Sequence, residues 1–205
     1  MPTVKKTLAA HIAELGRPVF TARELAGVSG RSASVVCQGL AFLARQGLAV
    51  KVAHGVWAAG GAMPSPYAVI PYILQRQRAY VSFTSALHLH GIIEQIPQVV
   101  TLASVAHTKE ITTHCGVFSV HHLASSFFKG FSWREAGGFF IAEPEKALVD
   151  CLYVSAFRER RFSHFPELDF PAAFSFKKAV AWAAFINSGA ALKFVLKRLA
   201  EIERD

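Results

Sequence analysis

Hydrophobic residues recur at helical spacing at the start of the chain. Four of them lie three or four positions apart: Val4, Leu8, Ile12 and Leu15. This spacing predicts a first helix, and Gly16 predicts its end. The next segment, Thr21-Ala22-Arg23-Glu24, matches a capping box, in which the Thr21 hydroxyl and the Glu24 carboxylate each bond the other residue's amide. A second, short helix is therefore expected over residues 22–27.

A third helix is predicted over residues 33–46, with Ser32 as its N-cap. One stripe of this helix is apolar and predicts a buried face, made of Ala33, Val36, Leu40 and Leu43. The opposite stripe holds Ser34, Gln38, Ala41 and Arg45. Weak alternation over residues 48–53 and 56–58, joined by His54-Gly55, predicts a hairpin of two strands.

Glycine and proline interrupt every period between residues 60 and 66, which predicts a boundary followed by a connecting helix. Beyond it, runs rich in β-branched and aromatic residues predict strands at 99–103, 116–121 and 138–142. The gaps between them are short, so an antiparallel or mixed sheet is favoured. Helices are predicted from Glu143-Pro144 onward and over residues 176–187 and 189–203. The expected fold class is α+β, with a first domain at 1–60, a linker and helix at 61–79, and a second domain at 80–205.

Charge and composition narrow the classes of function. The 205 residues carry a net charge of +8, and residues 1–60 hold seven Lys and Arg against two Glu. This local surplus of +5 favours a polyanionic partner. The longest uncharged stretch, residues 52–75, contains three prolines and a Gly-Gly pair, so no membrane span is expected. No signal-peptide core precedes Glu14, and the three cysteines form no CxxC, which favours a reduced, cytoplasmic protein without structural zinc.

Three helices followed by a hairpin are typical of a winged helix-turn-helix, whose third helix can enter the major groove of DNA. Gln38 is the best candidate base reader, because its amide can pair with adenine at two atoms. The other candidate DNA contacts lie at the start of that helix or flank the groove: Arg31, Ser32, Ser34, Arg45, Lys51 and His54. The alternative is a packing or dimerisation module with a solvated polar face.

Candidate catalytic and metal-binding residues are sparse. The nine histidines show no ligand spacing, so no metal or cofactor is expected. Glu143, Glu145 and Lys146 resemble the acid-plus-lysine sites of metal-dependent nucleases, but their spacing differs and no aspartate precedes Asp150. Helix capping is the favoured interpretation of this segment, with Lys146 and Asp150 paired on the helix surface. A nuclease remains the enzymatic alternative.

Two segments of the second domain resemble the core domain of AbiEi-type antitoxins: residues 80–97 (YVSFTSALHLHGIIEQIP) and 141–150 (IAEPEKALVD). The resemblance implies a non-enzymatic transcriptional regulator and antitoxin of a type IV toxin–antitoxin pair. Its N-terminal domain would bind operator repeats in double-stranded DNA and repress its own operon. Its C-terminal domain would counteract a nucleotidyltransferase-like toxin without a stable complex.

The resemblance also assigns residues by position. It gives the DNA-contact role to Arg31, Ser32, Ser34, Gln38, Lys51 and His54. It makes a second group frame the second domain: Ser85, His88, His90, Gly91, Glu94 and Gln95. This chain departs from the pattern in one respect, because its predicted recognition helix is apolar and poor in Lys and Arg.

Overall fold

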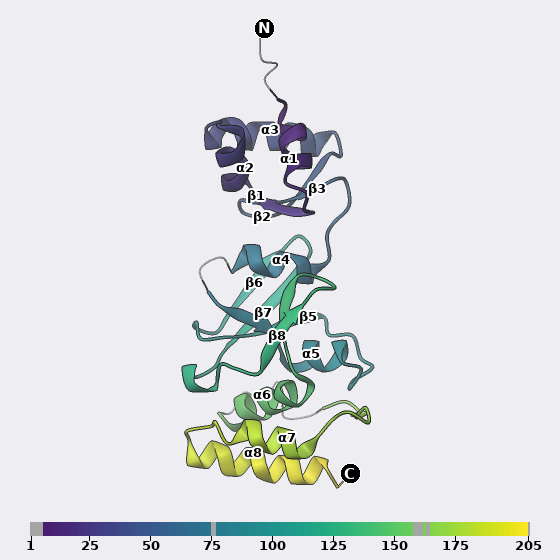
Figure 1. Cartoon of the computed structure of the whole chain (residues 1–205), viewed down its shortest axis with the longest axis vertical. Helices are drawn as coiled ribbons and strands as arrows, with labels where there is room; N and C mark the ends of the chain where they lie inside the picture. Colours follow the sequence, from purple (N-terminus) through teal and green to yellow (C-terminus); the bar gives the residue numbers. More distant parts are fainter. Residues whose placement is uncertain (1–5, 75–76, 158–161, 163–164, 205) are drawn as a thin grey trace. The chain divides into compact units, whose positions relative to one another are not determined.

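The computed structural model describes residues 6–74, 77–157, 162 and 165–204. The chain divides into two compact units, and the first comprises Met1–Gln75 together with Thr113–Gly116. The second comprises Arg76–Thr112 and Val117–Asp205. Both units contain helices and strands (Figure 1), so the predicted α+β class is confirmed.

The first unit opens with α1 (Leu8–Glu14), β1 (Val19–Thr21), α2 (Ala22–Ser29) and α3 (Ala33–Arg45). Strands β2 (Ala49–Ala53) and β3 (Val56–Ala59) follow, and α4 (Pro66–Ile73) comes after them. The three strands form one antiparallel sheet in the order β1-β3-β2. The predicted hairpin is therefore present, with β1 added along its β3 edge.

The helix starts follow from local hydrogen bonds. The capping box at α2 is confirmed, because Glu24 N donates to Thr21 Oγ1 at 3.1 Å and Thr21 N donates to Glu24 Oε2 at 2.7 Å. Ser32 caps α3 by accepting from Val35 N at 3.4 Å. Helix α1 begins after Thr7, whose hydroxyl accepts from Ala10 N. Val4, which was expected at the start of this helix, lies outside the described residues.

Helices α1, α2 and α3 share a core to which α3 contributes Val36, Leu40 and Leu43. Ala33 was predicted to join this stripe, but it is the first residue of α3 and is exposed. Gly39 explains how closely α1 and α3 approach. A Cβ atom at this position would lie 2.2 Å from Leu8 Cδ1, so the absent side chain makes room for that methyl group.

A six-stranded sheet forms the centre of the second unit, in the order β6-β7-β5-β4-β9-β8. Its strands are β4 (Ala79–Val81), β5 (Val99–Ser104), β6 (Lys109–Thr113), β7 (Gly116–His122), β8 (Phe131–Arg134) and β9 (Phe139–Ala142). The pairs β4–β9 and β5–β7 are parallel, whereas β4–β5 and β8–β9 are antiparallel. The sheet is thus mixed, one of the two arrangements predicted.

Helices pack together on one side of the second unit (Figure 1). They are α5 (Phe83–Leu89), α6 (Pro144–Ala156), α7 (Phe176–Ala183) and α8 (Gly189–Ile202), with a short 3-10 turn at Ser125–Phe127. Helix α6 contacts α5, α7 and α8 and is buried along most of its length. None of the helices in the described ranges is long and apolar enough to cross a bilayer.

Candidate nucleic-acid interface

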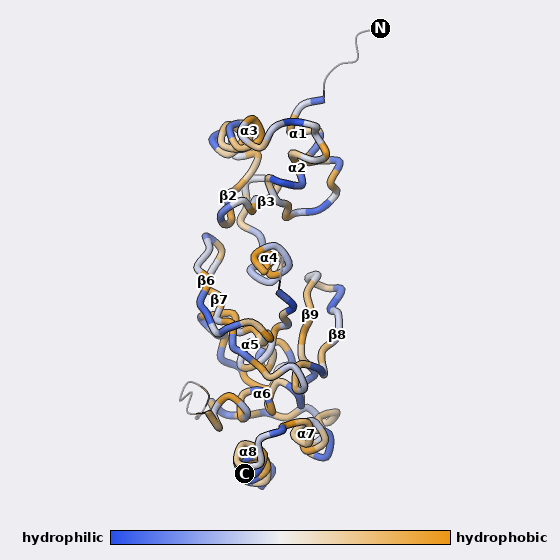
Figure 2. The backbone as a smooth tube through the Cα atoms, turned by 90° about the vertical axis from the view of Figure 1, so that its left-hand side faces the viewer, coloured by the Kyte–Doolittle hydropathy of each residue, from blue (hydrophilic) through white to orange (hydrophobic). Residues whose placement is uncertain are grey.

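The outward side of α3 is a mixed polar and apolar surface. It consists of the exposed residues Ser34, Val35, Gln38, Ala41, Phe42 and Arg45, which we call the outer face of α3. The side chains of Val35 and Phe42 are 47% and 51% exposed. Figure 2 shows both hydrophilic and hydrophobic residues on this helix. Three of the predicted contact residues, Ser34, Gln38 and Arg45, therefore share one accessible surface.

Two other predicted contacts lie at the amino end of α3 and are already engaged. The Ser32 hydroxyl serves as the N-cap, and the Arg31 guanidinium donates from Nη2 to the Lys6 carbonyl oxygen at 2.8 Å. Arg31 is half-buried and joins the segment before α1 to the turn before α3. In this structure it supports the position of α3, and a phosphate contact would require this hydrogen bond to be shared or broken.

Lys51 and His54, the last two predicted contacts, lie on the β2–β3 hairpin. Lys51 is exposed on β2 next to the buried Val52, and His54 is exposed in the turn. The turn is tied to the helices, because Ala22 N donates to the Gly55 carbonyl at 2.9 Å. The hairpin therefore holds one cation at a fixed place beside the helical part of the unit.

The charges of the first unit leave a basic surplus at its surface. Glu14 is bonded to Lys6, and Glu24 accepts from Arg17 Nη2 at 2.8 Å. Burial alone would raise the pKa of Glu24, but hydrogen bonds from Thr21 and Arg17 outweigh it, so the pKa is lowered and the carboxylate stays ionised. Both acids are thus matched by cations. The exposed cations without an ion pair, among the described residues of this unit, are Arg23, Arg45 and Lys51.

In the second unit, the segment predicted as a nuclease alternative divides its side chains between two environments. Glu143 Oε2 lies 3.1 Å from Lys178 Nζ and accepts from Trp182 Nε1 at 3.1 Å. Glu145 Oε2 lies 3.3 Å from the same ammonium group. The two carboxylates therefore hold α7 against the start of α6, and a metal ion bound by them would have to compete with Lys178.

Lys146 belongs to a different, buried group, the buried quartet of Tyr80, Ser82, Lys146 and Asp150, all 0% exposed. The Lys146 ammonium is bonded to Asp150 and donates to Tyr80 Oη at 3.1 Å. Asp150 Oδ2 also accepts from Ser82 Oγ at 2.6 Å and from Tyr80 Oη at 3.0 Å.

The expected surface pairing of Lys146 with Asp150 is therefore wrong in its location. The pairing exists, but α5 and α8 pack against α6, and two hydroxyl groups reach the pair, from Tyr80 in β4 and from Ser82 at the start of α5. Burial lowers the pKa of Lys146 and raises the pKa of Asp150, and each charge partly offsets the other's desolvation. The first resemblance segment supplies Tyr80 and Ser82, and the second supplies the charged residues, so the two segments meet here.

The rest of the first segment ties α5 to the sheet. Thr101 N donates to Ser85 Oγ at 2.8 Å, and Thr101 Oγ1 donates to the Ser82 carbonyl at 2.7 Å. Two histidines contact backbone carbonyls, with His90 Nε2 2.8 Å from Ala142 O and His88 Nδ1 3.3 Å from Ile93 O. Within the described ranges, no group of three or more His, Cys, Asp or Glu residues could hold a metal ion.

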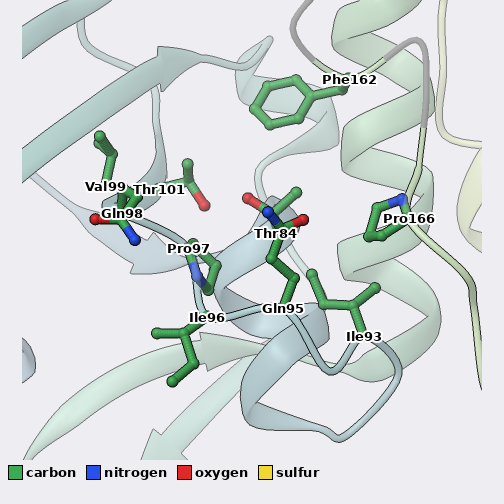
Figure 3. A pocket seen from close by; sticks show the side chains of 10 residues that line it. All are labelled: Thr84, Ile93, Gln95, Ile96, Pro97, Gln98, Val99, Thr101, Phe162 and Pro166. Atoms are coloured by element: carbon green, nitrogen blue, oxygen red, sulfur yellow. The ribbon is translucent and has the colours of Figure 1, made fainter.

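A pocket of about 240 Å³ lies beside α5 (Figure 3). Its described lining combines hydroxyl and amide side chains with apolar ones: Thr84, Ile93, Gln95, Ile96, Pro97, Gln98, Val99, Thr101, Phe162 and Pro166. None of these ten residues is ionisable, so they supply no acid, base or thiolate. Three residues of the resemblance segment are exposed after the end of α5: Gly91, Glu94 and the pocket residue Gln95. Sequence patterns did not predict this pocket, because Phe162 and Pro166 are distant in sequence from the rest of its described lining.

Neither the family models nor the curated protein sequences that were compared with this chain match it.

Proposed function

We propose that the protein is a DNA-binding transcriptional regulator whose first unit is a winged helix-turn-helix. In this proposal α3 is the recognition helix, α2 precedes it across the turn, and the β2–β3 hairpin is the wing. The observation that carries the proposal is the outer face of α3, which presents Ser34, Gln38 and Arg45 together while Lys51 extends from the adjoining hairpin.

The dimensions of α3 agree with this role. A helix with its side chains is about 10–12 Å in diameter, the major groove of B-DNA is about 12 Å wide, and the 13 residues of α3 extend about 20 Å along it. The exposed cations Arg23, Arg45 and Lys51 would contact phosphates, which position a protein on the duplex. The Gln38 amide would bind a base edge and supply sequence preference.

We further propose that the second unit acts as an antitoxin in the cytoplasm, without enzymatic activity. This part rests on the two segments that resemble AbiEi-type antitoxins. The regulator would bind operator repeats upstream of its own gene, repress that operon and counteract a nucleotidyltransferase-like toxin without a stable complex. Its test is growth rescue: co-expression with the product of an adjacent nucleotidyltransferase-like gene should restore growth, and mixing the two purified proteins should give no co-eluting complex. Persistent growth arrest would contradict the antitoxin role.

DNA binding is tested by a mobility shift on the region upstream of the protein's own gene, repeated from 50 to 300 mM salt. We expect log affinity to fall linearly with log salt, by about 0.9 per neutralised phosphate. An absence of any shift at low salt, on this region and on random duplexes alike, would contradict the proposal and favour a protein-interaction module instead.

Two variants separate positioning from base reading. Lys51→Ala should weaken binding to the upstream region and to random duplexes by similar factors. Gln38→Ala should weaken binding to the upstream region selectively, by about 1–3 kcal/mol. Lys193→Ala, which removes an exposed cation from α8, is the matched control and should leave both affinities unchanged. Equal losses on both duplexes for Gln38→Ala would contradict base reading by this side chain.

A further inference from the structure

We infer that the outer face of α3 reads A·T base pairs, with Val35 and Phe42 contacting thymine methyl groups and Gln38 pairing with adenine. This inference rests on the proposed function and names the sequence class that the interface prefers. The major-groove edge of thymine carries a C5-methyl group, and apolar side chains contact it.

The two apolar side chains are spaced for successive contacts along one groove. Val35 and Phe42 are seven positions apart, which places them on one line of the helix about 10.5 Å apart. This distance corresponds to about three base-pair steps at 3.4 Å each. Both side chains are about half exposed, and neither belongs to the described core of the first unit. Gln38 lies between them along the helix, next to Phe42 on its surface.

The polar groups on the same face favour A·T over G·C pairs. Guanine is most often read by Arg or Lys, and the only such residue in α3 is Arg45, in its last turn. The glutamine amide is suited to adenine N6 and N7. The face therefore combines one adenine reader with two thymine-methyl contacts and places its single cation at the end, near phosphate.

Charge around the face selects a polyanion over a second copy of the chain. Arg23, Arg45 and Lys51 are exposed and have no ion pair within the described part of the first unit. Arg45 lies on the face itself, so two copies docked through this face would bring like charges together, which opposes association. The phosphates that border the major groove would instead neutralise them while the apolar side chains enter between them.

The test begins with a library of random 20-bp duplexes, from which the full chain selects its preferred sequence. We expect A·T pairs to be enriched over a span of three to five positions. Each thymine of that span is then replaced by deoxyuracil, which lacks only the methyl group. Removal of a contacted methyl should weaken binding about fourfold. Substitution outside the span should leave affinity unchanged.

Phe42→Ala identifies the contact by a double-mutant cycle. In this variant, one thymine-to-uracil substitution that weakened binding of the original protein should lose most of its effect. Phe194→Ala is the matched control, because Phe194 is a 38% exposed phenylalanine on α8 of the other unit. In this control variant, the thymine-to-uracil substitution should weaken binding as much as it does in the original protein.

Three outcomes would overturn the inference, and they differ from failure of the proposed function. Equal affinity for thymine and uracil duplexes would show that methyl groups are not read. Selection of G·C-rich duplexes would show that another base pair is preferred. A change from dimer to monomer in Phe42→Ala, with unchanged DNA affinity, would assign the face to a second copy. Binding to no duplex at all would instead remove the proposed function itself.

Discussion

Two residues at the start of α2 show how much a local pattern can predict. Thr21 and Glu24 form the reciprocal bonds of a capping box because both partners lie within four positions and need no distant contact. The single cap bond of Ser32 at α3 is equally local, because its donor, Val35 N, lies three positions away. We expect Thr21→Ala to lower the free energy of unfolding of the first unit by about 1 kcal/mol, because it removes the N-cap acceptor. Urea denaturation followed by tryptophan fluorescence measures it, and Trp57 reports on this unit.

The lowered pKa of Glu24 predicts how acid affects this helix start. Because its pKa in the folded state lies below the ordinary value of 4.5, the stabilisation is fully present above that pH and is lost as pH falls through the folded pKa. Glu24→Gln should therefore be less stable than the original protein at pH 7, and the difference should narrow below pH 4.5. Thermal melts of both proteins from pH 7 to pH 3 measure this. A difference that stays constant over this range would contradict the assignment.

The buried quartet shows what residue spacing leaves undetermined. A spacing of four places Lys146 and Asp150 on one side of α6, but it does not say what covers that side. The cover comes from Tyr80 and Ser82, 70 and 68 positions away from Asp150. Phe127 adds an aromatic ring 3.8 Å from the Lys146 ammonium. Long-range contacts of this kind have no local signal in a single sequence.

Removing one charge of the Lys146–Asp150 pair should lower the free energy of unfolding much more than removing both charges. Lys146→Met leaves Asp150 buried without its cation, and we expect a loss of about 3–5 kcal/mol in unfolding free energy. The double variant Lys146→Met/Asp150→Asn has no uncompensated charge and should recover part of that loss. Chemical denaturation at pH 7 compares the two. A double variant no more stable than the single one would show that the loss is due to packing.

For individual helices and strands, the length of the element strongly affects whether its bounds can be predicted from the sequence. Strands β2, β3, β5, β7 and β9 and helices α3 and α8 were predicted close to their observed bounds, and the start of α6 was predicted at Pro144. Strands β6 and β8 were not predicted. Strands β1 and β4 have three residues each, too few for a period to be recognised, and sheet pairing alone defines them. Helix α7 ends at Ala183 rather than at residue 187, because the Ser188 cap of α8 requires a turn before it.

Gly130 controls how the loop before β8 meets α6 and α7. Its φ is +76°, and a Cβ atom there would lie 3.0 Å from both Lys146 Cγ and Trp182 Cζ2. We expect Gly130→Ala to lower the free energy of unfolding, measured by urea denaturation, by about 2–4 kcal/mol. Left-handed backbone strain and crowding of the new Cβ atom both contribute to this loss. Gly138→Ala is the control, because its φ is +71° but its nearest neighbour, Trp133 Cζ2, is 3.9 Å away. It should cost about 1–2 kcal/mol, and equal losses in the two variants would rule out crowding.

For the whole molecule, the distribution of charge along the chain could be predicted from the sequence. Which charges are paired, and which residues line a common pocket, could not. Counting residues located the basic surplus in the first third. The structure adds that Glu14 and Glu24 are already paired, which leaves Arg23, Arg45 and Lys51 as the exposed cations without an ion pair in the described part of that unit. Arg31 also proved to be engaged with the chain itself. The pocket beside α5 required the tertiary fold, since Phe162 and Pro166 line it together with residues that lie between positions 84 and 101.

This distribution predicts the salt dependence of DNA binding. If Arg23, Arg45 and Lys51 each neutralise one phosphate, the log–log slope should be about −2.7 for each bound copy. Lys51→Ala should reduce its magnitude by about 0.9, and Lys193→Ala should leave it unchanged. Fluorescence anisotropy with a labelled 20-bp duplex gives these slopes. An unchanged slope in Lys51→Ala would exclude this lysine from the phosphate contacts.

The contact between Leu8 and Gly39 has a practical consequence for anyone who trims the amino end of this protein. A methyl group of Leu8 occupies the space that a side chain at position 39 would otherwise take. A chain that starts beyond Leu8 would expose a hollow on the inward side of α3. Truncation there would therefore loosen the very helix whose opposite surface is proposed to meet the duplex, even though every residue of that surface would be retained.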